Sequence, residues 1–310
     1  MTEPDAAALS LAEARARART TKDFARADAL RDELAAAGWA VIDQPDGGWW
    51  LEPTPAKGLP APLDPHDVPS LLEQPATDDV SVHWVAEGWP GDIARAVASL
   101  RAHQGGRRVH YVVADVTDED PAAYGEDVEV LALAPSTGWA AAANAGLRRA
   151  TGHMVIVMDG SIEATGDVFG PLERALGEPA VGIAGPFGIV TRDLRQFDEA
   201  PEAGPCDAIE GYCMAMRREV VAAVEGFDEK FRWYRTADIE LSFRVKDRGL
   251  RTEVVPLPVT KHEHRMWFET EPAERAKWSK RNFYRFLDRW RDRWDLVLDP
   301  SPPDPAPPAP

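Results

Sequence analysis

Hydrophobic positions alternate between strand-like and helix-like spacing along much of the chain. Strands are predicted where short apolar runs occur, at 80–86, 108–115, 127–134 and 153–159. Helices are predicted where apolar residues recur three or four positions apart, at 91–103, 139–150 and 167–176. Strands that alternate with helices in this way favour an α/β fold with a mostly parallel sheet and helices on both faces.

A small helical unit with a hairpin is expected before this region, over residues 1–52. Two pairs fit the pattern of a capping hydroxyl followed three positions later by an acid: Ser10 with Glu13, and Thr20 with Asp23. Apolar runs on both sides of the turn-forming residues 45–48, Pro-Asp-Gly-Gly, predict the hairpin.

Proline-rich stretches divide the rest of the chain. Residues 53–77 are interpreted as an interdomain linker, 78–295 as the main domain, and 296–310 as a disordered tail. A strand that passes into a helix is predicted at 206–224, and an aromatic, arginine-rich helix at 272–294. The aromatic residues of that last helix suit either a core or a membrane surface: Trp278, Phe283, Tyr284, Phe286 and Trp290.

The composition narrows the class of protein. A formal net charge of −17 argues against broad electrostatic capture of nucleic acid or of an anionic membrane. The two cysteines, Cys206 and Cys213, match no zinc motif and exclude a disulfide scaffold, which favours the cytoplasm. The opening MTEPDAAALS lacks the features of a secretory signal, and no apolar run approaches ~18 residues. Peripheral contact with the inner face of a membrane stays open.

Carboxylates follow two of the predicted strands directly. Asp115 ends the strand at 108–115, and Asp159 ends the strand at 153–159. Ligands of parallel sheets bind beyond the carboxyl ends of the strands, so these positions are the first place to expect a site. After Asp159 come Gly160 and Ser161, where an Asp-x-Asp pair would form a metal-diphosphate clamp.

Residues 78–295 resemble a family 2 glycosyltransferase of the GT-A fold, a mostly parallel sheet whose strand ends bind a sugar nucleotide. The resemblance rests on motifs that occur in the family's order, at 138–167, 210–231, 234–256 and 259–264. It implies an inverting transferase of polysaccharide biosynthesis that moves a sugar, of the hexosyl type, from a nucleoside-diphosphate sugar. The implied acceptor is a hydroxyl of a polysaccharide or lipid-linked glycan, and the implied cofactor is Mn²⁺ or Mg²⁺.

The resemblance also assigns roles to single residues. Asp238 matches the base that takes the acceptor's proton, although it could equally begin a helix as a cap. Asp159 matches a ligand of the metal or a contact to the diphosphate, and the plain alternative is a turn cap. Ser161 stands where the second aspartate would be. His262 matches a histidine that could bind the metal, or is simply a surface residue.

Asp115 and Asn144 are weaker candidates for the donor site. Asp115 could contact the base or ribose of the donor, or belong to a solvated acidic turn. Asn144 could orient the donor loop, or pack at the start of its helix. The family's pattern is also broken at Ser161, at Ala237 and in the first loop, VAEGWPGD. The alternative is therefore a non-catalytic relative that binds sugar nucleotides or glycans.

The N-terminal stretch KDFARADALRDELAAAGWAVIDQPDGGWW resembles the C-terminal helical segment of cysteinyl-tRNA synthetases. The catalytic motifs of those enzymes are absent from the sequence, so aminoacylation is not inferred. The charges of this helix are mixed in sign, so no nucleic-acid partner is expected. The favoured interpretation is a docking or oligomerisation module that meets a protein partner through 1–52, and a weaker one is an accessory of tRNA charging.

Overall fold

The chain forms two compact units in a computed structural model, residues 1–61 and residues 62–310. The structure describes residues 4, 6–21, 23–43, 48–53, 62–117 and 119–301. Each unit is considered by itself. Among the helices of these described residues, none is both long and apolar enough to cross a membrane.

The first unit is a helical hairpin followed by a β-hairpin, as predicted. Its elements are α1 (Ala6–Thr20), α2 (Phe24–Ala36), β1 (Trp39–Asp43) and β2 (Trp49–Pro53), with β1 and β2 antiparallel. The turn at 44–47 lies outside the described residues. Buried Arg15 ties the helices to the hairpin, because its guanidinium donates two hydrogen bonds of 2.9 Å to the Asp43 carboxylate.

The predicted helix caps of this unit were wrong. Ser10 lies inside α1 rather than at its start, and Thr20 is the last residue of α1. Asp23 is itself the N-cap of α2, because its carboxylate accepts the amide of Arg26 at 3.1 Å. A carboxylate caps a helix as well as a hydroxyl does, so the sequence pattern alone could not decide whether Thr20 or Asp23 is the cap residue.

The second unit is built on an eight-stranded sheet. The order of its strands is β11 (Gly204–Cys206), β14 (Arg251–Val254), β8 (Val181–Gly185), β13 (Cys213–Arg217), β6 (Gly152–Met158), β3 (Asp78–Ala86), β4 (Val109–Asp115) and β5 (Val128–Ala132). Only β13 and β11 run antiparallel to their neighbours, so the sheet is mostly parallel, as predicted.

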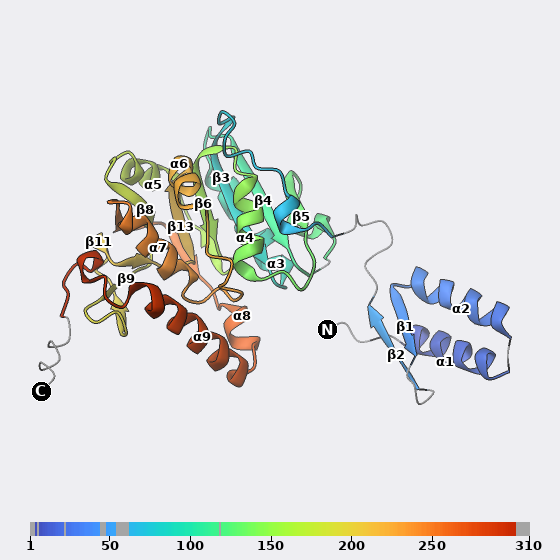
Figure 1. The fold of residues 1–310 in the computed structure, drawn as a ribbon. Coiled ribbons are helices and arrows are strands. Elements are labelled where there is room, and N and C mark those ends of the chain that lie inside the picture. Colours follow the sequence, from blue (N-terminus) through green and yellow to red (C-terminus); the bar gives the residue numbers. More distant parts are fainter. Residues whose placement is uncertain are drawn as a thin grey trace, which may run out of the picture. The chain divides into compact units, whose positions relative to one another are not determined.

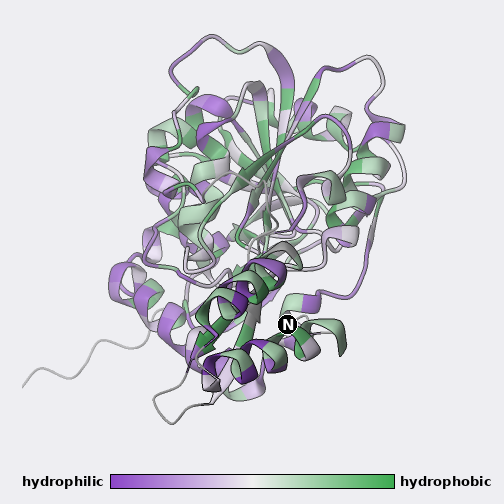
Figure 2. Cartoon of the chain, turned by 90° about the vertical axis from the view of Figure 1, so that its right-hand side faces the viewer, coloured by the Kyte–Doolittle hydropathy of each residue, from purple (hydrophilic) through white to green (hydrophobic). Residues whose placement is uncertain are grey.

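Helices cover both faces of this sheet (Figure 1). On one face lie α3 (Pro90–His103) and α5 (Phe169–Leu176), and on the other α4 (Trp139–Arg148), α6 (Arg218–Val224) and α7 (Ala237–Asp247). The alternation along β6 shows why both faces are covered. Ile156 and Met158 enter the first core, whereas Val155 and Val157 enter the second. Figure 2 shows these strands as a hydrophobic centre between more polar helices.

Smaller elements complete the second unit. A three-stranded sheet is formed by β10 (Phe197–Glu199), β9 (Gly188–Thr191) and β12 (Ala208–Ile209), and a pair by β15 (Val259–Lys261) and β7 (Ile162–Ala164). Two helices follow the last strand, α8 (Arg265–Glu269) and α9 (Pro272–Trp290). Single 3₁₀ turns complete the order: η1 (Pro65–Asp67), η2 (Pro121–Tyr124) and η3 (Trp294–Leu296).

The aromatic helix α9 is only partly core. Phe286 and Trp290 are buried against Phe243 of α7, with ring centroids 5.1 and 5.9 Å from that ring. Tyr284, however, is 54% exposed. The C-terminal part of α9 therefore fixes the helix to the domain, and its other faces are left free.

The proline-rich segments are more ordered than predicted. The connector is shorter than 53–77, because residues from 62 onward belong to the second unit. Val68 is buried there, and Leu63 donates its amide to Ala132. Residues 54–61 lie outside the described residues. In the tail, Leu296 and Val297 are buried, and residues 302–310 lie outside the described residues.

Gly152 fixes the approach of β6 to β3 and gives the first prediction. A Cβ at this position would lie 2.3 Å from the carbonyl carbon of Val80 and 2.4 Å from the amide nitrogen of Ser81. We expect Gly152→Ala to lower the free energy of unfolding by about 2 kcal/mol, since two central backbones must separate. Urea unfolding measures this. Gly106→Ala is the control, because open space surrounds Gly106; equal stability of the two variants would contradict the argument.

Candidate functional site

A cavity of about 1020 Å³ opens at the carboxyl ends of β3 and β6. Its walls come from the loop after β3, the turn after β6, the segments at 210–212 and 234–239, the segment at 261–268, and α9. The cavity therefore lies where parallel strands end, as ligand sites of α/β sheets do. Six carboxyl side chains line it: Glu87, Asp92, Asp159, Glu210, Asp238 and Glu263.

Asp159 lies directly after β6 and lines this cavity. Its Oδ1 accepts the amide of Ser161 at 2.8 Å, which closes the turn, and its Oδ2 lies 3.2 Å from Nε2 of His264. Burial raises the pKa of Asp159, but His264 and the Ser161 amide outweigh burial and hold that pKa below its usual range. Asp159 is therefore a turn cap and an ionised carboxylate at the same time.

Ser161 supplies an amide rather than a second carboxylate. The residue is 3% exposed, and its hydroxyl has no hydrogen-bond partner in the described part of the chain. A buried hydroxyl without a partner is costly, so it marks a polar group available to a ligand or water after a small rearrangement.

The histidine that meets Asp159 is His264, not His262. His264 is held between two aromatic rings, at centroid distances of 5.6 Å from Tyr212 and 4.7 Å from Tyr234. His262 also lines the cavity, but its Nε2 lies 2.6 Å from Glu163. The structure thus places His264, two residues after the predicted His262, beside the Asp159 carboxylate.

Asp92 and Arg95 fasten the turn at 159–161 to the cavity wall. Arg95 donates to Asp92 at 2.8 Å and to the carbonyl of Gly160 at 3.1 Å. Arg265 reaches Asp92 from α8 at 3.2 Å. Asp92 thus joins α3, the turn after β6 and the start of α8 in a single network of charges.

Asp238 lies in the first turn of α7 on another wall of the cavity. Its Oδ2 accepts the amide of Gly211 at 2.7 Å, and its Oδ1 accepts the amide of Ile239 at 2.8 Å. Burial raises its pKa in spite of these two donors and of Arg235 nearby. A carboxylate with a raised pKa binds a proton more readily, which suits a base. Thr236, rather than Asp238, is the N-cap of α7.

Two further acids of the cavity were missed by the sequence analysis. Burial, reinforced by Asp159, raises the pKa of Glu87 to about 8. Burial, reinforced by Asp238, raises the pKa of Glu210 to about 7. Glu87 is therefore largely protonated at neutral pH, and Glu210 becomes so below neutral pH. Glu87 follows β3 in the same way as Asp159 follows β6, and this strand-end position could have revealed it.

Asp115 and Asn144 lie outside the residues that line the cavity. Asp115 is buried, and its Oδ1 accepts the amide of Thr117 at 2.7 Å and its hydroxyl at 2.6 Å. Asn144 donates to the carbonyl of Phe227 at 2.9 Å and accepts its amide at 2.7 Å. Asn144 thereby joins the middle of α4, rather than its start, to the turn after α6. A contact of either residue with a donor stays a prediction.

The donor atoms at Asp159 suit a small divalent cation. In the described residues no group of three or more His, Cys, Asp or Glu side chains forms a metal cluster. Mg²⁺ and related ions, however, are commonly held by one or two protein side chains together with substrate phosphates. Asp159 supplies one carboxylate at the cavity wall, and Nε2 of His264 lies 3.2 Å from its Oδ2. The pair fits such an ion when the imidazole is neutral, because a protonated imidazole has no lone pair for a metal.

Comparison of sequences shows what the N-terminal unit is similar to. Residues 2–50 match the family model described as the cysteinyl-tRNA ligase anticodon binding domain. Cysteine–tRNA ligase of Opitutus terrae is 55% identical over 51 residues, which are 16% of this chain and 11% of that protein. The enzyme of an Arthrobacter species is 65% identical over 37 residues, 12% of this chain and 8% of that protein. The chain thus spans about a tenth of these relatives.

Comparison of structures identifies the fold of the second unit. The crystal structure of GalNAc-T7 with UDP, GalNAc and Mn²⁺ superposes with a TM-score of 0.56 at 15% identity, covering 70% of this chain and 50% of that one. The mannosyltransferase PcManGT from Pyrobaculum calidifontis, in complex with GDP-Man and Mn²⁺, gives 0.50 at 20% identity, covering 72% and 67%. The second unit therefore has the GT-A fold, as predicted from its motifs.

The protonated acids of the cavity predict how stability depends on pH. Glu87 and Glu210 have pKa values of about 8 and about 7 in the folded chain, against 4.5 as the ordinary value. The folded state therefore holds more protons than the unfolded state, and stability falls as the pH rises from about 5 toward 8. We expect the double variant Glu87→Gln, Glu210→Gln to flatten this slope by about 1 kcal/mol per pH unit.

Urea unfolding at pH 5.5, 6.5 and 7.5 measures the slope. Glu263→Gln is the matched control, because Glu263 is an exposed glutamate of the same cavity. Parallel slopes for the parent and the double variant would show that neither acid is protonated in the folded chain.

Proposed function

We propose that the second unit is an inverting glycosyltransferase that uses a nucleoside-diphosphate sugar and a divalent cation. The observation that carries this proposal is one cavity, at the strand ends of a GT-A fold, with Asp159 beside His264 on one wall and Asp238 on another. The two similar structures, one with UDP and one with GDP-Man, support a nucleotide donor of this class.

Asp238 is the proposed base. The acceptor hydroxyl gives its proton to the Asp238 carboxylate while its oxygen bonds to the anomeric carbon of the donor. The bond from that carbon to the diphosphate oxygen breaks at the same time, and the nucleoside diphosphate leaves with the electron pair. The amides of Gly211 and Ile239 hold the carboxylate in place, and burial keeps it basic.

Asp159 and His264 are the proposed holders of the cation and of the diphosphate end of the donor. A divalent cation bound there would offset the negative charge that grows on the leaving diphosphate. Tyr212 and Tyr234 pack against the His264 ring in edge contacts. These contacts hold the side chain in one conformation, with its Nε2 directed at Asp159.

The choice between the two histidines can be tested directly. We expect His264→Ala to weaken manganese-dependent binding of the cognate nucleotide at least tenfold, because it removes a cation ligand. His262→Ala should change binding less than threefold, because His262 pairs with Glu163 instead. Calorimetric titration with UDP, GDP and dTDP, with manganese or with EDTA, measures both. A large loss in His262→Ala alone would restore the assignment made from the sequence.

Asp238→Asn separates binding from chemistry. The amide still accepts a hydrogen bond but takes no proton, so we expect turnover to fall at least 10²-fold. Affinity for the donor should stay within a few-fold of the parent. The exposed Asp198 gives the control Asp198→Asn, with parental turnover expected. Unchanged turnover in Asp238→Asn would remove the residue from the role of base, and retained anomeric configuration of the product, read by NMR, would exclude a single displacement.

The non-catalytic alternative has no specific support from the cavity, since the carboxylates that chemistry needs are held in place. That the N-terminal unit is a docking or oligomerisation module stays a prediction. Its arginines are largely paired with acids of the same unit, as Arg15 and Arg19 are with Asp43 and Arg26 is with Glu33. The described part of this unit therefore has little unpaired positive charge with which to bind RNA.

A further inference from the structure

The cavity has a second wall whose chemistry differs from that of the donor end. The strand-end walls carry Glu87, Asp92 and Asp159. The lining from α8 and α9 is aromatic: Trp267, Phe268, Phe283 and Tyr284. Phe268 is 60% exposed and Tyr284 54% exposed, so their rings face open space at the mouth. Exposed aromatic rings that line a cavity indicate a surface for a ligand.

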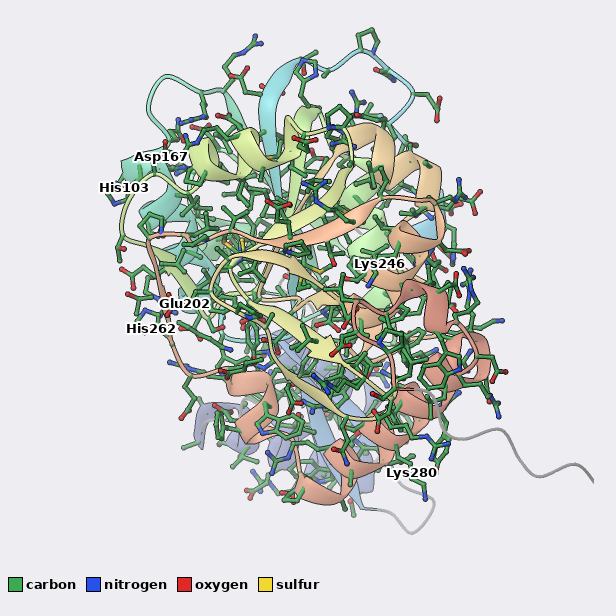
Figure 3. The ribbon with its side chains drawn as sticks, turned by 90° about the vertical axis from the view of Figure 1, so that its left-hand side faces the viewer. His103, Asp167, Glu202, Lys246, His262 and Lys280 are labelled. Atoms are coloured by element: carbon green, nitrogen blue, oxygen red, sulfur yellow. The ribbon has the colours of Figure 1, made fainter. Side chains whose placement is uncertain are left out.

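Cations stand beside these rings. Arg195, Arg235 and Lys280 all line the cavity, and none makes an ion pair with a carboxylate of the described residues. The guanidinium of Arg235 lies 4.8 Å from the ring of Trp267, and Lys280 belongs to α9, at the lower edge of Figure 3. α9 as a whole carries six Lys or Arg residues and two acids, although the complete chain has a net charge of −17.

The three cations come from separate elements that the fold brings to one rim. Arg195 lies between β9 and β10, Arg235 precedes α7, and Lys280 lies in the middle of α9. Phe197 of β10 packs on Phe286 of α9 with ring centroids 5.9 Å apart, which holds these two elements together. Arg235 is also close enough to Asp238 to lower the pKa of that acid against the effect of burial. Arg235, one of these three cations, is therefore near the proposed base.

We propose that this wall is the acceptor site and that the acceptor is an acidic glycan, a sugar chain that carries carboxylate or phosphate groups. The inference rests on the proposed function, since it assigns the acceptor of the same reaction. The apolar faces of sugar rings suit Trp267, Phe268 and Tyr284, and the anionic groups suit Arg195, Arg235 and Lys280. A sugar hydroxyl then meets Asp238 between the two walls.

The concave position of the aromatic rings favours a glycan over a membrane surface. A helix that lies on a bilayer presents its apolar residues outward along one stripe. Here the apolar residues of α9 are divided between the domain core, where Phe286 and Trp290 are buried, and the cavity, which Phe283 and Tyr284 line. A single chain can enter such a groove, whereas a bilayer cannot follow it.

Binding of defined saccharides to the full chain tests this proposal. The probes are hexameric oligogalacturonate and dextran phosphate as acidic glycans, maltohexaose as a neutral glycan, and vesicles of phosphatidylglycerol. We expect at least one acidic glycan to bind at least tenfold more tightly than maltohexaose, with an affinity that falls as salt is raised. The double variant Arg195→Gln, Lys280→Gln should bind it at least tenfold more weakly. Lys230→Gln is the matched control, an exposed lysine outside the cavity.

Each other outcome overturns the proposal. Equal affinity for acidic and neutral glycans, no binding of either acidic glycan, or a loss shared by Lys230→Gln would remove the charged acceptor. Binding to the vesicles alone, lost in the double variant, would make this wall a lipid site instead. Nucleotide titration in parallel separates the two levels: nucleotide binding without acidic-glycan binding refutes only the acceptor, and acidic-glycan binding without any nucleotide binding refutes the transferase.

Discussion

Two adjacent residues, Gly211 and Tyr212, hold the proposed site together through their backbones. The amide of Gly211 donates to Asp238 at 2.7 Å, and the carbonyl of Tyr212 accepts the amide of Asp159 at 3.0 Å. The two aspartates are thus joined through one short segment of backbone, although they are far apart in the sequence. This segment leads into β13, the antiparallel strand beside β6, so its position follows from the pairing of the sheet. The backbone therefore fixes how far Asp238 lies from Asp159.

The motif order was enough to predict the fold and to point to two aspartates that line the cavity, because their positions follow from where strands and helices begin and end. Their roles stay predictions. The choice between His262 and His264 was beyond the sequence, because it depends on register. β15 pairs with β7, which places Lys261 opposite Ile162 and directs the amide of His262 to the carbonyl of Ser161. Two residues later the chain has turned toward Tyr212 and Tyr234, and only there does an imidazole reach Asp159. The order of motifs in the sequence cannot decide which of two histidines, two residues apart, faces Asp159.

Asn144 and Asp115 show the other limit of sequence analysis. Asp115 ends a strand, where ligand-binding residues often occur, whereas Asn144 lies in the middle of a helix. In the structure Asn144 is hydrogen-bonded to Phe227, and Asp115 is hydrogen-bonded to Thr117. Hydrogen bonds of this kind leave no periodic pattern in the sequence. Glu210 illustrates the converse. Its proximity to Asp238 is a long-range contact, so nothing in its local sequence marked it as a perturbed acid.

The two positions where an expected acid is missing, Ser161 and Ala237, reduce the negative charge at the cavity. Ala237 is 1% exposed and Ser161 is 3% exposed, so a carboxylate at either position would be buried beside Asp238 or Asp159. The cavity already contains Glu87 and Glu210, whose pKa values burial raises to about 8 and about 7. Further like charges would drive the remaining acids toward their protonated forms, and Asp159 would lose the ionised state that His264 supports. Fewer carboxylates thus help to keep Asp159 charged, so the missing acids do not by themselves favour the non-catalytic alternative.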